Sequence, residues 1–320
     1  MAETSALART RCLVTGGAGF IGSNLTRFLL EAGSSVTVLD NFVTGRPEHL
    51  PRVDNLTVIH GNIVTFAGIG ELCAESDFVF HLAAQVGNVK SLEETETDAA
   101  TNILGSVRLL KSCRGTRLRK LVYSSSSAIF GEAERLPIDE SHPQRPASFY
   151  ALSKLAAERY ALLAREHWNV PAVCLRYFNV FGLPMENNEY TGVISIFFNR
   201  LKAGQPLTIY GDGEQLRDFV YVRDVARANV LAALRAEPGS VFNIGTGVAS
   251  SVRGLALTMR DLTGQDVGIH YGPSRSSEVR RSVADIGRAR AGLGFEPGYD
   301  LRQGLAEMWE ALAVDSALPR

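Results

Sequence analysis

The chain has 320 residues, 45% of them apolar and 21% charged, which is the balance of an ordinary globular protein with a substantial core. Its formal net charge of −1 provides no broad basic surface, so we expect neither a nucleic-acid partner nor membrane binding. An anionic ligand must therefore meet individual arginines or backbone N–H groups.

The segment Met1–Arg11 lacks the apolar run of a signal peptide, and no later segment approaches the ~18 apolar residues of a membrane span. The cysteines have neither C-x-x-C nor metal-ligand spacing, which predicts buried free thiols and no metal site. They are Cys12, Cys73, Cys113 and Cys174. Free thiols are typical of a reducing compartment, so we expect a cytoplasmic protein.

The first predicted strand, Cys12–Val14, leads into a glycine-rich run, Gly16–Gly22, and a helix through Leu25–Leu30 that Gly33 closes. The run contains G-x-G-x-x-G between a strand and a helix, the context in which this motif binds a dinucleotide. The absent side chains let the backbone approach a pyrophosphate, and the helix N-terminus supplies N–H groups. An ordinary glycine-rich turn is the alternative.

The second predicted strand, Val36–Leu39, is followed by Asp40. A carboxylate at this point accepts hydrogen bonds from ribose hydroxyls and repels a 2′-phosphate, which favours NAD over NADP. Arg46 follows on the same loop, where a phosphate contact would weaken that preference; a surface role is the alternative.

Later apolar segments predict further strands, and the intervals between them leave room for helices. These segments are Leu56–Ile59, Phe78–Phe80, Leu121–Tyr123 and Ala172–Leu175. The alternation predicts parallel βαβ units in a doubly wound (Rossmann) α/β sheet whose strands are covered on both faces. Beyond Gly182 the pattern is less regular. We expect an NAD-binding domain over 1–180, to which 219–245 returns, and mainly a substrate lobe over 181–320.

Tyr150 and Lys154 lie at positions i and i+4 of a predicted helix, so their side chains share one face. An ammonium beside a phenol lowers the pKa of the phenol, which suits the pair to proton abstraction near neutral pH. Two exposed helix residues are the alternative. The run Ser124–Ser127 directly follows a predicted strand, where open α/β sheets bind ligands, and a hydroxyl there can bond a substrate oxygen. Some of these serines are expected to cap turns instead.

With these residues in order, the chain resembles the extended short-chain dehydrogenase/reductase family of the NAD-dependent epimerase/dehydratase type. Within it, the sequence is similar to the UDP-galactose and UDP-N-acetylglucosamine 4-epimerases. The resemblance extends over nearly the whole chain. Its motifs are Thr15–Gly22, Leu39–Asn41, His81–Ala84, Ser124–Gly131, Tyr150–Lys154, Arg176–Asn179, Gly211–Gly213 and Arg217–Phe219.

The resemblance implies that Tyr150 is the catalytic base and that Lys154 assists it and holds the nicotinamide ribose. It implies that Ser126, five residues before Gly131 as in the family, polarises the substrate. The further cofactor residues that it implies are Gly16, Gly19, Phe20, Ile21, Gly22, Asp40, Asn41, Phe42, Thr44, Gly45, Asn62, Ile63, Leu82, Ala83, Ala84, Asn102, Ser124 and Phe178.

The resemblance also implies a substrate site. Asn179, Arg217 and Arg275 would contact the diphosphate, to which guanidinium groups are well matched, and Tyr210 and Phe219 the nucleotide base and ribose. The remaining implied residues are Ser127, Val193, Thr208, Glu278 and Ser282, beside Ser126 and Tyr150 themselves.

Two positions depart from the family pattern. Asn62 stands where an acidic residue commonly meets the adenine amino group, and its amide oxygen can still accept that bond. Ser127-Ala128 stands where sugar 4,6-dehydratases carry an acidic pair, so the second acid/base that water elimination needs is missing there. We therefore do not expect dehydratase activity.

The implied reaction inverts C4 of a nucleotide-linked hexose, with a UDP-hexose favoured, through a transient 4-keto sugar. NAD is regenerated in each cycle, and a homodimer is the expected working unit. The nucleotide base and the sugar stay open. Ser282, seven residues after Arg275, is where the epimerases place a residue beside the C2 substituent. A small serine predicts room for an N-acetyl group; a solvent-facing serine is the alternative.

Uronate epimerases and decarboxylases of the same fold are the nearest alternatives. A carboxylated sugar should need an additional cation, but Leu183–Gly192 contains no Lys or Arg, and Asn179 stands where the uronate 4-epimerases have Thr. A non-catalytic NAD-binding sensor is a further alternative. Such proteins often lose the Tyr, Lys and Ser set, which is intact here.

Overall fold

The computed structural model describes residues 2–184, 192–274 and 279–317. A parallel sheet forms its centre, in the order β11-β6-β5-β4-β1-β2-β3. The strands are β1 (Arg11–Thr15), β2 (Ser35–Asp40), β3 (Leu56–His60), β4 (Phe78–His81), β5 (Lys120–Ser126), β6 (Ala172–Tyr177) and β11 (Val241–Ile244). The strand order reverses between β1 and β4, the point at which such sheets open a crevice for ligands.

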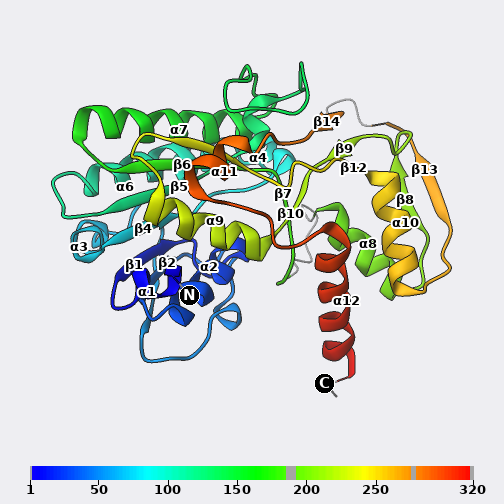
Figure 1. Cartoon of the computed structure of the whole chain (residues 1–320), viewed down its shortest axis with the longest axis horizontal. Helices are drawn as coiled ribbons and strands as arrows, with labels where there is room; N and C mark the ends of the chain where they lie inside the picture. Colours follow the sequence, from blue (N-terminus) through cyan, green and yellow to red (C-terminus); the bar gives the residue numbers. More distant parts are fainter. Residues whose placement is uncertain (1, 185–191, 275–278, 318–320) are drawn as a thin grey trace.

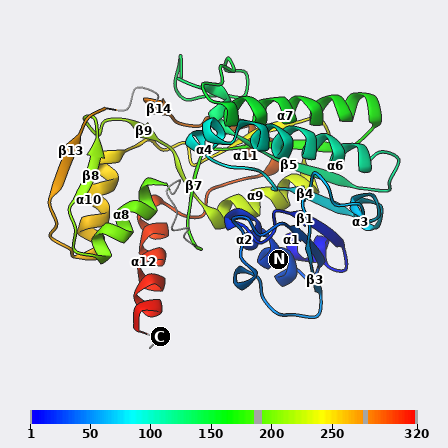
Figure 2. The ribbon, with the colours of Figure 1, turned by 180° about the vertical axis from the view of Figure 1, so that it is seen from behind.

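Helices cover both faces of this sheet (Figures 1 and 2). One face packs against α1 (Ala2–Leu7), α2 (Phe20–Glu31), α9 (Val222–Arg235) and α11 (Gly287–Leu293). The other face packs against α3 (Ile69–Glu75), α6 (Ser106–Ser112) and α7 (Phe149–Trp168). The prediction of a doubly wound α/β sheet is therefore confirmed.

Helix α7 is defined at both ends by local chemistry. The Ser148 hydroxyl accepts a hydrogen bond from the Ala151 N–H at 3.1 Å, which caps the first turn. Asn169 ends the helix in the left-handed conformation, with φ of 56°. The capped first turn holds Tyr150 at the end of the sheet where the ligand crevice is expected.

Short helices lie on the connections between the main elements. They are η1 (Pro47–His49), α4 (Asn88–Glu93), α5 (Thr95–Ala99), η2 (Ala100–Gly105) and η3 (Ser127–Phe130). Helices α4 and α5 both contact α7, so the segment after β4 is held against the helix that carries Tyr150 and Lys154.

A second group of elements lies beside the sheet, to the right in Figure 1. Its helices are α8 (Val193–Lys202), α10 (Val252–Thr263) and α12 (Leu301–Ala317). Its strands are β7 (Asn179–Phe181), β8 (Leu207–Tyr210), β9 (Leu216–Arg217), β10 (Phe219–Tyr221), β12 (Ser250–Ser251), β13 (Ile269–Gly272) and β14 (Arg281–Ser282). A separate core, in which Phe198 stacks on Trp309 with ring centroids 5.8 Å apart, holds this lobe together.

Two details differ from the sequence analysis. Ser124–Ser126 are the last residues of β5 rather than a loop after it, because their backbone pairs with β6. The hydroxyls of Ser124 and Ser125 bond Tyr177 on β6 and Glu158 on α7. Strand β3 is half exposed rather than covered on both faces, because it lies at the edge of the sheet. Of the segment 219–245, α9 packs on α2 and β11 joins the sheet, whereas β10 pairs with β7 outside it. The domain boundary near residue 180 stays a prediction.

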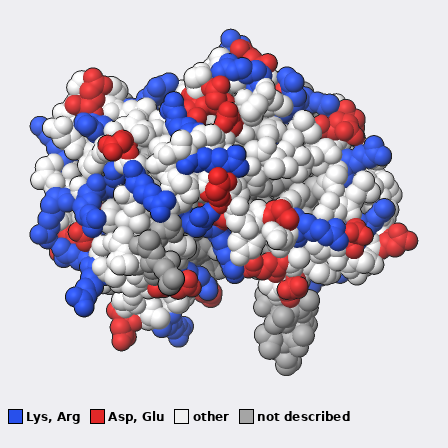
Figure 3. Space-filling model, viewed as in Figure 1, with Lys and Arg blue, Asp and Glu red and all other residues white. Residues whose placement is uncertain are grey.

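Acidic and basic side chains are interspersed over the face in Figure 3, as expected from a net charge of −1. None of the helices in the described part of the chain combines the length and the apolar character that crossing a membrane requires.

Candidate active site

The carboxyl ends of the central strands bring most of the predicted residues to one edge of the sheet. Strand β1 ends before the glycine-rich loop, β2 ends at Asp40, and β4 ends before Leu82–Ala84. Strand β5 ends at Ser126, and β6 ends before Phe178. Because all these strands are parallel, their carboxyl ends share one edge, and this edge is the candidate site.

The glycine-rich loop packs closely on the β4 connection. Gly16 has φ of +72°, and a Cβ placed on it would lie 2.6 Å from the Ala83 nitrogen. A Cβ on Gly22 would lie 2.1 Å from the Gly16 carbonyl oxygen, so neither position accepts a side chain. A Cβ on Gly19 meets only that same oxygen, at 3.4 Å. The backbone at Gly19 therefore faces open space, which fits a loop that a dinucleotide approaches.

Asp40 joins this loop to the second strand. Its Oδ2 accepts a hydrogen bond from the Ala18 N–H at 2.9 Å, and its Oδ1 accepts one from the Phe42 N–H at 2.8 Å. Each oxygen keeps a further acceptor position for a ribose hydroxyl. Asn41 and Asn62 use their side-chain oxygens in local turns, toward the N–H groups two residues later. Their contacts with a cofactor stay predictions.

A chain of buried hydrogen bonds ties β1, β4 and η2 together. His81 Nδ1 lies 2.7 Å from the Thr15 hydroxyl, and its Nε2 lies 2.9 Å from the Ser106 hydroxyl. The Ser106 hydroxyl donates to the Asn102 carbonyl, so His81 Nε2–H is the donor to Ser106 and Nδ1 accepts from Thr15. Burial, and then the charge of Lys154, lowers the pKa of His81 to about 3. His81 is therefore neutral and structural.

Asn102, predicted to line the cofactor, is 1% exposed and fixes the chain after β4. Its side-chain oxygen accepts from the Gln85 N–H at 2.8 Å. Its Nδ2 lies 3.0 Å from each of three acceptors, the Gln85 carbonyl, the Asp98 carboxylate and the Ser153 hydroxyl. Asn102 thus connects the 82–85 segment to α7, the helix that carries Tyr150.

Ser126, Tyr150 and Lys154 meet where β5 ends and α7 begins. The Ser126 oxygen accepts a hydrogen bond from the Ala128 N–H at 3.2 Å, which leaves its hydroxyl hydrogen for Tyr150. Lys154 is 4% exposed, and its Nζ lies 4.6 Å from the centre of the Tyr123 ring. Burial lowers the pKa of Lys154 to about 8. Ser126 and Tyr150 therefore lie together at the junction of β5 and α7, and Lys154 follows one turn later on α7, over the Tyr123 ring.

The expected lowering of the Tyr150 pKa by Lys154 is not what the structure gives. Burial raises the pKa of Tyr150, and the hydrogen bond from Ser126 is what opposes this rise. The prediction placed the ammonium at the phenol oxygen, whereas Lys154 lies over the Tyr123 ring. Ser126 therefore lowers the pKa of Tyr150, an effect that the sequence analysis assigned to Lys154.

The other serines of β5 have structural partners. The Ser124 hydroxyl bonds the Tyr177 hydroxyl at 2.9 Å. The Ser125 hydroxyl donates to Glu158 at 2.6 Å, and Glu158 forms a two-pronged ion pair with Arg176, also at 2.6 Å and 3.0 Å. This pair is almost completely buried, so loss of one partner would leave an unpaired charge in the interior. Sequence reasoning missed the role of Glu158.

The predicted substrate residues of the second lobe come together through short strands. Arg217 on β9 is the register partner of Ser282 on β14, and Asn179 on β7 is that of Phe219 on β10. Between these pairs, the buried carboxylate of Asp218 accepts from four groups: the N–H and hydroxyl of Thr246 and the N–H groups of Gly247 and Ala284. Asp218 thus clamps the strands that carry the predicted substrate contacts, a role that the sequence analysis missed.

The other predicted positions are spread over the site. Ile63 is buried in the core on the face of the sheet that α3, α6 and α7 cover, and its contact with a cofactor stays a prediction. Thr208 and Tyr210 lie on β8, and Val193 begins α8. Thr44 and Gly45 follow Asp40, with Gly45 against Ala18. Arg275 and Glu278 lie outside the described residues.

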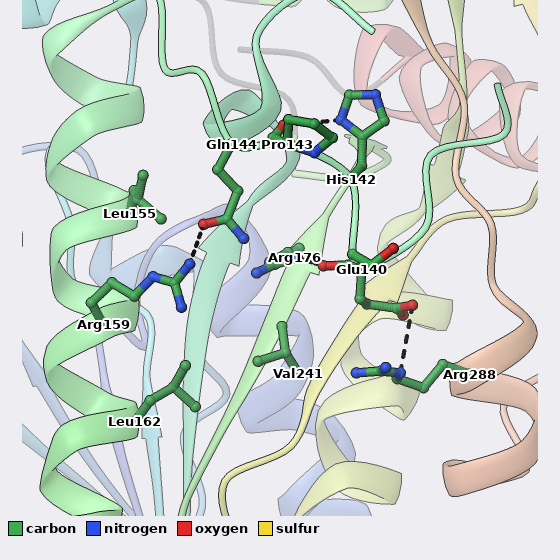
Figure 4. A pocket seen from close by; sticks show the side chains of 11 residues that line it. Glu140, His142, Pro143, Gln144, Leu155, Arg159, Leu162, Arg176, Val241 and Arg288 are labelled. Atoms are coloured by element: carbon green, nitrogen blue, oxygen red, sulfur yellow. Dashed lines mark hydrogen bonds and ion pairs between the residues drawn. The ribbon is translucent and has the colours of Figure 1, made fainter. Parts of the chain in front are cut away.

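A cavity of about 640 Å³ lies apart from these residues, between α7, β6, β11 and the 140–144 segment (Figure 4). Its three arginines have partners: Arg176 pairs with Glu158, Arg159 donates to Gln144 at 2.7 Å, and Arg288 lies 3.7 Å from Glu140. The charged groups of this cavity already have partners, and no predicted site residue lines it. We therefore do not assign the reaction to this cavity.

Comparisons with known proteins agree with this geometry. Residues 12–245 match the model of the NAD dependent epimerase/dehydratase family. The chain is 37% identical to the UDP-glucose 4-epimerase of Mycolicibacterium smegmatis, over 94% of this chain and 97% of that one. It is 30% identical to the UDP-N-acetyl-alpha-D-glucosaminuronate decarboxylase of Bacillus cytotoxicus, over 93% and 96%.

Two solved structures are similar over nearly the whole length. One is the UDP-N-acetylglucosamine 4-epimerase of Methanobrevibacter ruminantium M1 in complex with UDP-N-acetylmuramic acid, with a TM-score of 0.93, 33% identity and coverage of 96% and 99%. The other is the UDP-glucose 4-epimerase of Thermotoga maritima with UDP-glucose, with a TM-score of 0.91, 37% identity and coverage of 96% and 99%.

Proposed function

Because the chain belongs to the NAD dependent epimerase/dehydratase family, we propose that it inverts C4 of a UDP-linked hexose and keeps NAD bound while doing so. The observation that carries the proposal is the arrangement at the carboxyl edge of the sheet: Ser126 ends β5, Tyr150 lies in the capped first turn of α7, and Lys154 is buried one helical turn further along. A phenol, a hydroxyl and an amine in this arrangement can exchange a proton with a sugar hydroxyl.

The residues present fit NAD. The open backbone at Gly19 would receive the pyrophosphate, the remaining acceptor positions of Asp40 would receive ribose hydroxyls, and Lys154 would hold the nicotinamide ribose. Bound NAD would supply hydride chemistry at C4 of the sugar. The protein orients the reactants and moves protons.

In the proposed reaction, Tyr150 first releases its own phenolic proton to solvent, and its phenolate oxygen then takes the proton of the sugar O4 hydroxyl. The Ser126 hydroxyl, which already donates to Tyr150, stabilises negative charge on the phenol oxygen and can bond O4 in turn. Once the 4-keto sugar has presented its other face, Tyr150 returns the proton to O4. The sugar is then inverted at C4, and Tyr150 is ready for the next cycle.

Arg217 and Asn179 are proposed to hold the diphosphate, with Tyr210 and Phe219 at the nucleoside. Arg275 and Glu278 are proposed with them on sequence grounds alone. A neutral protein binds a diphosphate through local cations, and a guanidinium fork suits its oxygens. The sugar would then lie between Ser282 and Tyr150, with the C2 substituent toward Ser282.

A decarboxylase relative makes a uronate substrate the second candidate. A panel of UDP-glucose, UDP-N-acetylglucosamine and UDP-glucuronic acid, followed by NMR of the products, separates the two. We expect C4 inversion of the neutral hexoses. Release of carbon dioxide from the uronate, with no inversion of the hexoses, would make the chain a decarboxylase.

We also propose a homodimer that uses the outer face of α7. Phe149, Leu152, Tyr160 and Leu163 are each about half exposed there, and Val89 and Leu92 are exposed on the adjacent α4. An apolar face of this kind on paired helices is typical of a surface that a second copy covers. The mass of the purified protein in solution would test this proposal.

The first prediction concerns cofactor content. We expect purified protein to carry NAD(H) and to need none added, because the glycine-rich loop, Asp40 and Lys154 enclose it through every cycle. Denaturation and measurement of the released nucleotide check this. A preparation that is active only with added NADP⁺ would contradict the role given to Asp40.

The second prediction concerns the sugar. Ser282 is 9% exposed, and we expect UDP-N-acetylglucosamine and UDP-N-acetylgalactosamine to interconvert at least as well as the plain hexose pair. Ser282→Tyr should lower kcat/KM for the N-acetylated pair about 10-fold more than for the plain pair, because its ring fills the space that the acetamide needs, a difference of about 1.4 kcal/mol. Ser282→Ala is the matched control. If Ser282→Tyr affects both pairs alike, Ser282 does not select the sugar.

A further inference from the structure

A buried carboxylate on α5 has no role in the reaction as described so far. Asp98 is 1% exposed, whereas Glu93, Glu94 and Glu96 beside it are exposed. Burial of a carboxylate is costly unless hydrogen bonds and an opposite charge compensate it. The contacts of Asp98 therefore indicate what holds its charge.

The direct contacts of Asp98 come from neutral groups. Its Oδ1 accepts from Asn102 Nδ2 at 3.0 Å, and the same Nδ2 lies 3.0 Å from the Ser153 hydroxyl. Ser153 is the residue before Lys154 on α7, and α5 packs against α7. Burial raises the pKa of Asp98, and the charge of Lys154 opposes this rise. Among the described residues, no cation lies within 4.0 Å of the Asp98 carboxylate, and Lys154 is the cation whose charge acts on it.

Lys154 in turn is faced by titratable groups from every element around it. Glu158, further along α7, is already bound to Arg176 and Ser125. His81 on β4 is neutral, and burial raises the pKa of the Cys174 thiol on β6, which keeps that thiol protonated. Tyr123 on β5 is likewise a neutral phenol, because burial raises its pKa. Tyr150 is neutral at rest as well. Asp98 is thus the carboxylate whose charge Lys154 balances.

We propose that Asp98 is a positioning residue for the reaction, whose buried carboxylate keeps Lys154 in its charged form beside Tyr150. The inference rests on the proposed epimerase function. It also explains why Asn102 and Ser153 are joined by a hydrogen bond in the interior: their polar groups hold Asp98 next to the helix that carries Lys154.

The proposal predicts a particular pH dependence. Burial lowers the pKa of Lys154 to about 8, and Asp98 is the largest influence that opposes this. Asp98→Asn keeps the shape and removes the charge, so the pKa of Lys154 should fall further. The ammonium, which is proposed to hold the nicotinamide ribose, should then be lost at a lower pH. The same substitution removes a charge that raises the pKa of Tyr150. If Asp98→Asn acted only through Tyr150, it would lower the pKa of the base, and activity would then not fall as the pH rises.

The experiment compares kcat against pH from about 6 to 9 for wild type, Asp98→Asn and Glu96→Gln, which removes an exposed carboxylate of the same helix. We expect Asp98→Asn to lose about 10-fold in kcat at pH 8 and less than about 3-fold at pH 6, with its basic limb at lower pH. Glu96→Gln should follow wild type. An unshifted basic limb in Asp98→Asn would overturn the proposal, even if wild type is an active epimerase.

A reciprocal measurement needs no activity and does not depend on the Asp98 variant folding. Carbon-13 NMR of labelled aspartate follows the Asp98 carboxyl in wild type and in Lys154→Met. We expect the pKa of Asp98 to be higher in Lys154→Met, because its cation is gone. An identical Asp98 titration in the two proteins would contradict the pairing, whether or not the chain proves to be an epimerase.

Discussion

Tyr150→Phe should lower the rate of epimerisation by about 100-fold or more, which is the scale of general acid–base catalysis. The substitution keeps the ring and removes the oxygen that accepts the O4 proton. Neither Ser126 nor Lys154 can replace it, because the serine hydroxyl is a poor base and the Lys154 amine lies over the Tyr123 ring. The measurement is kcat for the UDP-hexose pair.

Tyr271→Phe is the matched control, since it removes a hydroxyl from an exposed tyrosine on β13. We expect it to retain wild-type kcat. The NAD content of both variants should equal that of wild type, which separates loss of chemistry from loss of cofactor. Near-normal turnover by Tyr150→Phe would rule out the mechanism.

Arg217→Ala should raise KM by roughly 10- to 150-fold, because a charge-assisted hydrogen bond contributes ~1.5–3 kcal/mol to binding. The diphosphate is bound alike in the ground and transition states, so kcat should change little. The Kd of UDP, measured by calorimetry, should rise by the same factor as KM.

Arg253→Ala is the control for Arg217, because Arg253 is an exposed cation of the same lobe that lies 3.7 Å from Glu214. We expect it to bind UDP like wild type. An unchanged KM in Arg217→Ala would place that guanidinium away from the diphosphate, and a loss confined to kcat would mean that it acts on the transition state instead.

Much of the sheet could be predicted because its strands are short apolar runs separated by helices. The predicted strands lie within the observed ones, and the glycine-rich loop occurs at the predicted turn between β1 and α2. Strand β5 was predicted too short, because serine has low strand propensity. Pairing with β6 as far as Ser126 and Tyr177 outweighs that preference.

The second lobe was harder to predict. Its strands β9, β12 and β14 have two residues each, too few for an alternating pattern, and they join segments that are distant in the chain. The clamp at Asp218 depends on these tertiary pairings. A buried aspartate between Arg217 and Phe219 has no signature that separates it from a surface residue.

The burial of Asp98, near the catalytic residues, was equally hard to predict. It lies among acidic residues, and this pattern is typical of a solvated helix. Its burial comes from the packing of α5 on α7, which the sequence does not reveal. Likewise, the spacing of Tyr150 and Lys154 predicts a shared helix face, but the position of Lys154 over the Tyr123 ring depends on the side chains of β5.

The most direct test of the central claim uses UDP-glucose labelled with deuterium at C4, incubated with purified protein in ordinary water and without added NAD. We predict UDP-galactose that keeps the deuterium at C4, because the hydrogen leaves and returns as hydride without contacting solvent, while the O4 proton passes through Tyr150. Loss of the label to water, or no inversion at C4 of either this sugar or UDP-N-acetylglucosamine, would contradict the account.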